Sequence, residues 1–422
     1  MKIKTKYTSY SEVSKIKKPA VKKPKKPWFV MGLLIRFLSI FDLKKVKFTY
    51  TFKDGFKIGK EPYLILMNHS CFLDLKIANK ILFPKPYSIV CTTDGLVGKK
   101  WLMQKIGCIP TQKFVRDISL IKDMEYILKH NKVSVLMYPE AGYSFDGTST
   151  AIPENLSRLV KLFNVPVMMI KTDGAFLHDP LYNGLQLRKV KVSAEVSLLL
   201  NKEETQTLKA EEINKRIKEA FTFDAFKSQK ENNITIDESF RADGLERILY
   251  KCPACKCEGQ MVGEGITLSC KKCGAAYLLT DLGELKKVGG DTEFTHIPDY
   301  YNWERECVKE ELLNQQYNLE TDVEIGVIKD YKALYMIGKG KLTHNENGFT
   351  LTSDDGLLNY QQSPLHSYSL NSDYFWYEIG DVISIGDRNE LYYCFPSKEV
   401  SVTKARLATE ELYKLKQEEL SK

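Results

Sequence analysis

The chain has 422 residues, of which 43% are hydrophobic and 27% are charged, and its formal net charge is +8. This composition is globular and the length suits two or three domains, which excludes a disordered chain and a small disulfide-rich secreted module. Most of the excess positive charge lies in a basic tail at residues 1–27. We expect no cleavable signal peptide and a cytoplasmic location.

The segment at residues 28–41 reads WFVMGLLIRFLSIF and follows the basic tail directly. It is shorter than the ~20 apolar residues of a membrane-spanning helix, and Arg36 interrupts it. It suits an interfacial helix whose apolar residues enter the membrane surface while Arg36 and nearby lysines meet anionic lipid. We therefore expect peripheral contact with the cytoplasmic face of an anionic membrane. The alternatives are a buried helix behind a solvated tail and a basic patch for nucleic acid.

Short apolar runs alternate with helical patterns from Tyr63 to about Leu200. The predicted strands read YLILMN, YSIVCTT, VSVLMYPE, VPVMMIKTD and KVKVSAEVSLLL, and the predicted helices read CFLDLKIANKILF, VGKKWLMQKIG and ISLIKDMEYILKHNK. The alternation predicts an α/β domain over residues 28–240, with a mostly parallel sheet whose faces are covered. His69 and Glu140 each lie just beyond a predicted strand, at the edge where such sheets bind ligands.

Two C-x-x-C pairs, CPAC and CKKC, predict a small metal-binding unit at residues 245–286. Their cysteines are Cys252, Cys255, Cys270 and Cys273. The spacing fits a zinc ribbon, and four thiolates leave no open position on the metal, so we expect a structural Zn²⁺. Rubredoxin-type iron, a redox dithiol and disulfides are the alternatives. No aromatic-basic motif accompanies these cysteines, so we expect no nucleic-acid partner.

Residues 290–422 read as short strands separated by turns, followed by one amphipathic helix. Asn347-Gly348 and Asp355-Gly356 are typical hairpin turns. We predict a β-rich antiparallel C-terminal domain with a final helix, an arrangement similar to pleckstrin-homology-like domains.

Four motifs between residues 60 and 200 occur together in one order. The first is NHSCFLD with Asn68, His69 and Asp74; the second is GCIPTQK with Gly107, Ile109, Pro110 and Lys113; the third is YPEAGYS with Pro139, Glu140 and Ser144; the fourth is Val165-Pro166-Val167. This block resembles the glycerolipid acyltransferases, and more specifically the 1-acyl-glycerol-3-phosphate acyltransferase family.

The resemblance implies transfer of a fatty acyl group from a CoA or acyl-carrier-protein thioester to a hydroxyl of a lysophosphatidate-like acceptor. Such a transfer needs a base, and imidazole suits this near neutral pH. His69 is the expected base, and Asp74 is expected to fix its tautomer. We expect direct attack without a covalent intermediate, and oxyanion donors among backbone N–H groups at the nearby helix start. Taken alone, His69 and Asp74 would be interpreted as a helix-capping pair.

The resemblance also implies an acceptor site, which we expect to include Asn68, Ser70, Lys113, Arg116, Glu140, Gly142 and Tyr143. Tyr143 stands where the family has an arginine that is expected to hold the acceptor phosphate. A tyrosine offers one hydroxyl in place of a charged guanidinium that can form two hydrogen bonds. Lys113 is a weaker substitute for a second-motif arginine, which Arg116 could compensate. The acceptor could then be lysophosphatidate, another lysophospholipid or a less charged alcohol. The alternative is a catalytically degenerate lipid-binding scaffold with a zinc-ribbon interaction module.

Overall fold

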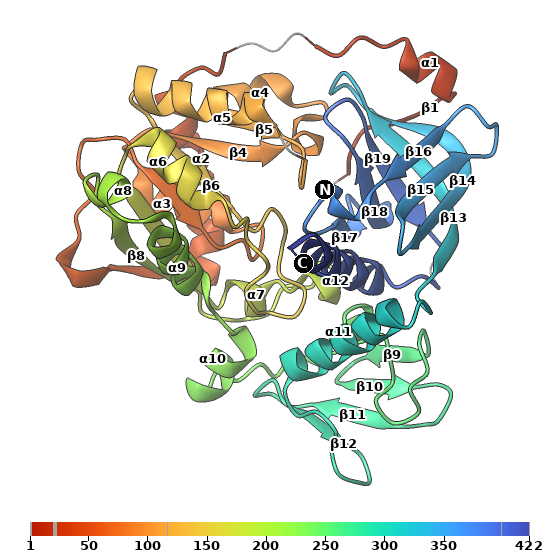
Figure 1. Cartoon of the computed structure of the whole chain (residues 1–422). Helices are drawn as coiled ribbons and strands as arrows, with labels where there is room; N and C mark the ends of the chain where they lie inside the picture. Colours follow the sequence, from red (N-terminus) through yellow and green to blue (C-terminus); the bar gives the residue numbers. More distant parts are fainter. Residues whose placement is uncertain (1, 20–22, 116, 398, 422) are drawn as a thin grey trace.

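The computed structural model describes residues 2–19, 23–115, 117–397 and 399–421. Figure 1 shows three parts: an α/β unit on the left, a β-rich C-terminal unit on the right, and a smaller sheet with one long helix below them. The final helix lies at the centre, between the C-terminal unit and the long helix above the smaller sheet.

The α/β unit is built on a seven-stranded sheet with the order β2-β8-β7-β3-β6-β4-β5. Its strands are β2 (Thr49–Phe52), β3 (Leu64–Met67), β4 (Tyr87–Thr92), β5 (Cys108–Thr111), β6 (Ser134–Met137), β7 (Val167–Asp173) and β8 (Ser193–Leu200). β8 runs antiparallel to β7, and the other neighbouring pairs run parallel. The predicted mostly parallel sheet is confirmed.

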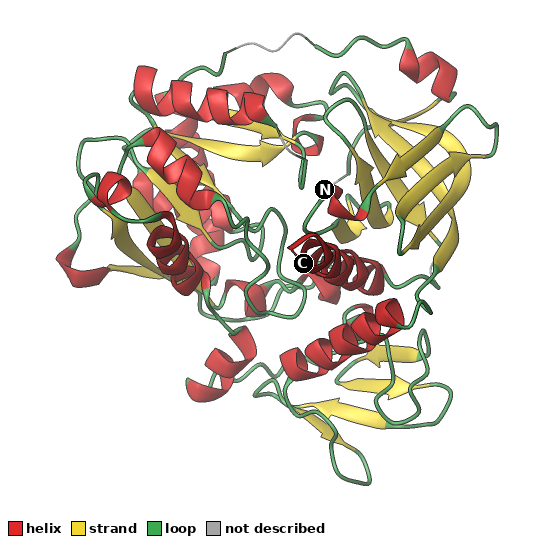
Figure 2. Ribbon diagram, in the orientation of Figure 1, coloured by secondary structure: helices red, strands yellow, loops and turns green. Residues whose placement is uncertain are grey.

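Helices cover both faces of this sheet, as Figure 2 shows. On β3, Ile65 and Met67 pack with α2 and α3, whereas Leu64 and Leu66 pack with the helices of the opposite face. The helices of the unit are α2 (Phe29–Lys45), α3 (Asp74–Leu82), α4 (Lys100–Ile106), α5 (Ile118–Glu125), α6 (Leu156–Phe163), α7 (Ala175–His178), α8 (Glu204–Thr207), α9 (Ala210–Phe221) and α10 (Ala225–Glu231). A strand with both faces buried reads as a continuous apolar run, which explains the sequence LILM.

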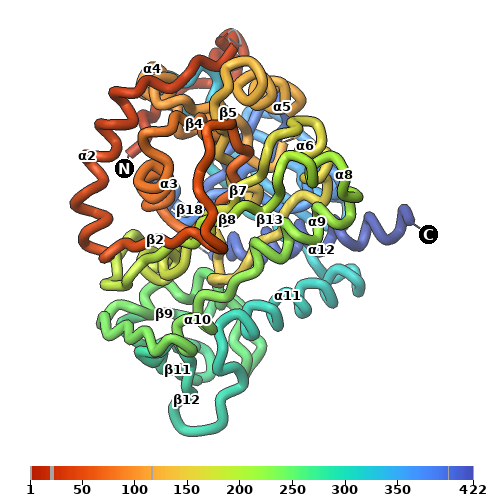
Figure 3. Tube along the Cα trace, turned by 90° about the vertical axis from the view of Figure 1, so that its left-hand side faces the viewer, coloured from red at the N-terminus to blue at the C-terminus, as the bar shows by residue number. Residues whose placement is uncertain are grey.

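Helix α2 lies on the surface against α3 (Figure 3). The side chain of Asn79 donates to the carbonyl of Gly32 at 3.2 Å, and Lys76 pairs with Asp42. Its outer face is an exposed apolar row, here called the α2 stripe: Phe29, Val30, Leu33, Leu34, Phe37, Leu38, Ile40 and Phe41. Within the described parts of the chain, no helix is both long enough and apolar enough to cross a bilayer.

A four-stranded antiparallel sheet with the order β12-β11-β10-β9 carries the cysteine pairs. Its strands are β9 (Met261–Glu264), β10 (Thr267–Cys270), β11 (Ala276–Leu279) and β12 (Leu285–Lys287). Helix α11 (Ile297–Leu313) follows. The sequence analysis was wrong here, because after residue 290 it expected strands and a final helix, and no helix before those strands. Pro298 in the first helical turn and the buried spacing of Ile297, Tyr301 and Val308 are the helical signals that it missed.

The C-terminal unit is an antiparallel sheet with the order β16-β15-β14-β13-β19-β18-β17. Its strands are β13 (Leu319–Ile328), β14 (Leu334–Asn345), β15 (Gly348–Ser353), β16 (Asn359–Gln362), β17 (Asn371–Trp376), β18 (Gly380–Gly386) and β19 (Leu391–Pro396), and α12 (Val402–Ser421) ends the unit. The two predicted hairpin turns and the final helix are confirmed. Likeness to pleckstrin-homology-like domains stays a prediction.

The N-terminal segment that we predicted as a basic tail is partly structured. Strand β1 (Thr5–Tyr7) pairs in parallel with β14, and the short helix α1 (Tyr10–Ser14) follows it. Tyr10 donates a hydrogen bond to Glu390 at 3.0 Å. The start of the chain is therefore held against the C-terminal unit.

A buried charge cluster anchors α12. Arg305 of α11 lies 2.7 Å from Glu410, and Arg406 lies 3.2 Å from the same carboxylate. Burial opposes the ionised form of Glu410, but the two arginines outweigh it and hold the pKa of this carboxyl at about 2. Removing one member of such a cluster leaves buried charge without compensation.

Replacement Glu410→Ala is expected to lower the free energy of unfolding by about 3–5 kcal/mol, because it leaves the buried Arg406 without its carboxylate, while Arg305 keeps only Glu411. Thermal and urea unfolding measure the loss. Glu419→Ala is the matched control on the exposed end of α12, where Lys416 is the one ion-pair partner of Glu419 among the described residues, and it should change stability little. Equal effects of the two substitutions would contradict the assignment.

Candidate active site

The first and third motifs meet at one edge of the sheet. Strand β3 ends at Met67 and is followed by Asn68 and His69, and the next strand along the sheet, β6, ends just before Tyr138 and Glu140. Because β3 and β6 are parallel neighbours, their carboxyl ends bring these residues together. Helix α3 begins at Asp74, and the side chain of Asp74 reaches back to His69.

The imidazole of His69 is hydrogen-bonded to Asp74, with Nδ1 2.8 Å from Oδ2. The same oxygen accepts the backbone N–H of Ser70 at 3.0 Å and that of Cys71 at 3.4 Å. Since Oδ2 is an acceptor in all these contacts, the neutral imidazole carries its hydrogen on Nδ1, and its lone pair is on Nε2. The N–H groups of Ser70 and Cys71 already donate to Asp74, so the expectation of backbone oxyanion donors at the helix start, which named no residue, stays a prediction.

Glu140 fixes the backbone of His69. Its Oε2 accepts the N–H of His69 at 2.8 Å, and its Oε1 accepts from the N–H and the hydroxyl of Thr150, each at 3.2 Å. Burial raises the pKa of Glu140 from 4.5 to about 7, against the lowering effect of these hydrogen bonds. Both oxygens are thus bound by the protein, and Glu140 acts on the site through His69.

Asn68 joins β3 to β7. Its side-chain oxygen accepts the N–H of Thr172 at 2.8 Å, and its amide donates to the carbonyl of Thr172 at 3.1 Å. The amide also donates to the hydroxyl of Ser70 at 3.4 Å. Asn68 and Ser70 are both buried, so they hold the strand end in place from behind His69.

The ring of His69 lies between two tyrosines. Its centroid is 4.1 Å from that of Tyr138 and 4.2 Å from that of Tyr143. The His69 side chain remains 19% exposed, so part of it reaches solvent despite the two covering rings. Burial, followed by the charge of Asp74, raises the pKa of both tyrosines well above 10, so their hydroxyls are neutral.

Two of the remaining predicted acceptor residues, Lys113 and Gly142, lie close to Tyr143. The ammonium of Lys113 lies 6.0 Å from the centroid of the Tyr143 ring. Gly142 is buried, but a side chain added there would meet no atom within 4 Å, so open space lies beside its Cα. Arg116 lies outside the described residues.

The C-terminal unit closes over this site, which the sequence analysis did not predict. Arg406 of α12 donates to the carbonyl of Tyr143 at 3.3 Å, and the rings of Phe145 and Tyr374 lie 4.8 Å apart. Burial raises the pKa of Asp373 on β17 to about 6, and the positive charge of Lys113 opposes that rise. An acidic side chain from the C-terminal unit thus accompanies the predicted phosphate-binding lysine.

The four predicted metal ligands come together in one cluster. All four sulfur atoms lie within 4.8 Å of one another, with 3.7 Å between Cys252 and Cys273 and 3.8 Å between Cys255 and Cys270. Thiolates at the corners of a zinc tetrahedron, with Zn–S of about 2.3 Å, stand about 3.8 Å apart, whereas a disulfide needs about 2.05 Å. The cysteines fit Zn²⁺, which would be held by four thiolates and contribute to folding.

Residues 45–171 match the model of the Acyltransferase family. These residues form a domain of the acyltransferase family. The resemblance to glycerolipid acyltransferases is therefore confirmed at the level of the family. A solved structure similar to this chain is the 1-acyl-sn-glycerophosphate (LPA) acyltransferase PlsC from Thermotoga maritima, with 15% sequence identity and a TM-score of 0.36. That similarity covers 45% of this chain and 76% of PlsC. No curated protein matches the chain.

Several residues at the acyltransferase site were not predicted. Tyr138 is the first residue of the quoted third motif, so its position directly after a strand was a usable signal. Thr150 donates to Glu140 and Thr172 donates to Asn68. The folded chain brings these residues together, and no sequence pattern around either threonine indicates the contact.

Replacement Glu140→Gln should change how stability depends on pH. Between pH 4.5 and about 7, folded wild type keeps a proton on Glu140 that the unfolded chain has lost. Its free energy of unfolding therefore falls as the pH rises through this window. The variant lacks this term, so its stability relative to wild type should rise with pH, by at most about 1.4 kcal/mol per pH unit. Urea unfolding across the window measures it, and a difference that stays constant would contradict the assignment.

Purified protein is expected to contain close to one zinc ion per chain. Cys255→Ser should remove most of the metal and destabilise the unit, because an incomplete thiolate set binds Zn²⁺ weakly. Cys257→Ser is the matched control, since Cys257 is not part of the four-cysteine cluster. Metal analysis and thermal unfolding with and without a chelator give the readout. Full metal content in Cys255→Ser would show that the cluster is not the binding site.

Proposed function

We propose that the protein transfers a fatty acyl group from a CoA or acyl-carrier-protein thioester to a hydroxyl of a glycerolipid acceptor of the lysophosphatidate type. The observation that carries the proposal is the hydrogen bond of His69 to Asp74 at the edge of an acyltransferase-family sheet. It leaves Nε2 free to accept a proton.

In the proposed reaction, Nε2 of His69 takes the proton of the acceptor hydroxyl while its oxygen attacks the thioester carbonyl. The tetrahedral intermediate collapses, the carbon–sulfur bond breaks, and the imidazolium returns the proton to the leaving thiolate. Asp74 stabilises the imidazolium through Nδ1. Base catalysis of this kind contributes about 10²–10⁴-fold. No covalent acyl-enzyme is needed, which agrees with the buried position of Cys71.

The surroundings of Tyr143 support an acceptor headgroup that is less anionic than a phosphate monoester. Tyr143 offers no positive charge. Burial raises the pKa of Asp373, and the charge of Lys113 opposes that rise, so this acidic side chain lies close to the lysine. Together Tyr143 and Asp373 reduce the positive potential available to a phosphate. A lysophospholipid with a diester headgroup or a neutral glycerolipid suits such a site better than lysophosphatidate itself.

We also propose that the enzyme works as a peripheral protein on the cytoplasmic face of a membrane. The exposed α2 stripe supports this, because its apolar side chains suit insertion at the headgroup boundary. Helix α2 packs on α3, the helix that begins with Asp74, so contact with lipid would place the site close to its acceptor. In this proposal the zinc unit is structural, and the C-terminal unit, whose strand number and final helix suit a pleckstrin-homology-like domain, covers the site.

The alternative function is that of a lipid-binding scaffold with a degenerate site and a zinc-ribbon interaction module. One observation favours it: tyrosine rings cover both faces of the His69 imidazole. The retained contact between His69 and Asp74 favours the enzyme, since a scaffold does not need a base with a fixed tautomer.

Replacement His69→Ala is expected to lower acyl transfer by about 10²–10⁴-fold, because it removes the general base. The assay follows thioester consumption with acyl-CoA and acyl-carrier-protein donors against a panel of lysophospholipids and neutral glycerolipids. His130→Ala is the control, because His130 is an exposed histidine of the same domain. No turnover by folded, lipid-binding wild type across the panel would favour the scaffold.

Replacement Tyr143→Arg should shift acceptor preference toward lysophosphatidate, because it supplies a charged guanidinium that can bind a phosphate monoester through two hydrogen bonds. The quantity to compare is the ratio of kcat/KM for lysophosphatidate to that for a diester lysophospholipid. Tyr143→Phe is the control, since it removes the hydroxyl and adds no charge. A ratio that is unchanged in Tyr143→Arg would show that Tyr143 does not face the acceptor headgroup.

A further inference from the structure

A pocket opens at the C-terminal end of α2, apart from the acyltransferase site. Its volume is about 440 Å³, within the range of small-molecule sites. The lining residues are Arg36, Ser39, Ile40, Leu43, Lys44, Lys47, Phe48 and Lys80. They come from α2, the turn after it, the residue that leads into β2, and α3.

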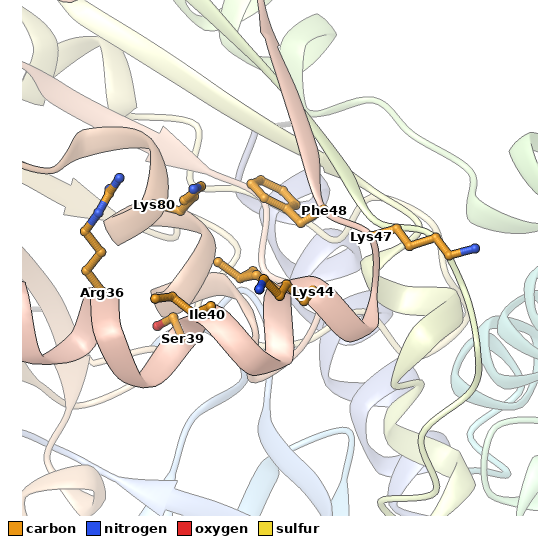
Figure 4. Close-up of a pocket in the computed structure, with 8 residues that line it drawn as sticks. Arg36, Ser39, Ile40, Lys44, Lys47, Phe48 and Lys80 are labelled. Atoms are coloured by element: carbon orange, nitrogen blue, oxygen red, sulfur yellow. The ribbon is translucent and has the colours of Figure 1, made fainter.

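The pocket combines basic and apolar side chains. Its basic residues, here called the rim, are Arg36, Lys44, Lys47 and Lys80, and its apolar residues are Ile40, Leu43 and Phe48. Four of its lining side chains are cations and none is a carboxylate. Figure 4 shows Arg36 and Lys80 at one end, Lys44 below Phe48 in the middle, and Lys47 at the far end with its nitrogen turned outward. Among the described residues, Lys44, Lys47 and Lys80 have no carboxylate oxygen within 4.0 Å, whereas the nearby Lys76 is paired with Asp42. The positive charge of the rim is therefore available to a ligand.

The pocket adjoins the α2 stripe. Ile40 belongs to both, and Phe37 and Phe41 lie beside it on the exposed face of the helix. A ligand held by the rim could thus extend apolar chains along α2 in the same direction as the stripe. A soluble anion would use only the cations and would leave the apolar neighbours without a role.

We propose that this pocket binds the phosphate-bearing headgroup of an anionic phospholipid, with Arg36, Lys44 and Lys80 as its main contacts. The proposal rests on the membrane contact proposed above and adds a lipid preference to it. The α2 stripe supplies affinity for any bilayer, and the pocket supplies the preference for anionic lipid. The bound lipid is a docking partner at the membrane surface and is separate from the acceptor that meets His69.

The test compares binding of the full chain to two kinds of vesicle, phosphatidylcholine alone and phosphatidylcholine mixed with phosphatidylglycerol. The triple variant Arg36→Gln/Lys44→Gln/Lys80→Gln removes three cations of the rim. The matched control Lys209→Gln/Lys215→Gln/Lys218→Gln removes the same charge from exposed lysines on and beside α9, which covers the opposite face of the sheet. Thermal unfolding checks that both variants fold.

Wild type and the control are expected to prefer the mixed vesicles, and the rim variant should lose about 100-fold in affinity for them while binding phosphatidylcholine as before. Equal losses in the two triple variants would overturn the pocket and leave only diffuse attraction between charges. Competition by free CoA at the rim would overturn the lipid assignment. If wild type binds neither vesicle, the membrane contact itself fails, and this outcome differs from failure of the pocket alone.

Discussion

One oxygen of Asp74 organises the candidate active site. It accepts the imidazole N–H of His69 and two backbone N–H groups of the turn that precedes α3. The same contact therefore shapes the strand-to-helix connection and sets the tautomer of the proposed base. The structural and catalytic interpretations of this pair are not exclusive, because a carboxylate that binds the turn is also held rigidly enough to orient an imidazole.

Long-range packing adds a second layer to this arrangement. Arg406 donates to the backbone carbonyl of Tyr143. Arg406 is held by Glu410, which also pairs with Arg305. A buried charge cluster thus connects α11 and α12 to the loop beside His69. The C-terminal unit contributes to the environment of the site, because Arg406 binds the backbone of Tyr143 and Asp373 lies near Lys113.

The sequence predicted the parts of the molecule that depend on local pattern. The alternation of buried strands and amphipathic helices predicted the sheet and placed His69 and Glu140 at its edge, and paired cysteines predicted the thiol cluster. Helix α11 was missed because its buried positions include tyrosines and a glutamate in place of aliphatic residues. The contact of Arg406 with Tyr143 joins residues 263 positions apart, and only the packed structure brings them together.

Asp74→Asn tests the central claim most directly. An asparagine keeps the size of the side chain, and its amide oxygen can still accept the N–H groups of the turn, but it carries no negative charge and does not stabilise an imidazolium. We predict that kcat for acyl transfer falls by about 10²-fold or more, while KM for the thioester changes little and the protein keeps its melting temperature within a few degrees. A kcat equal to that of wild type would contradict the account, because Asp74 would then only hold the turn and His69 would not depend on it for catalysis.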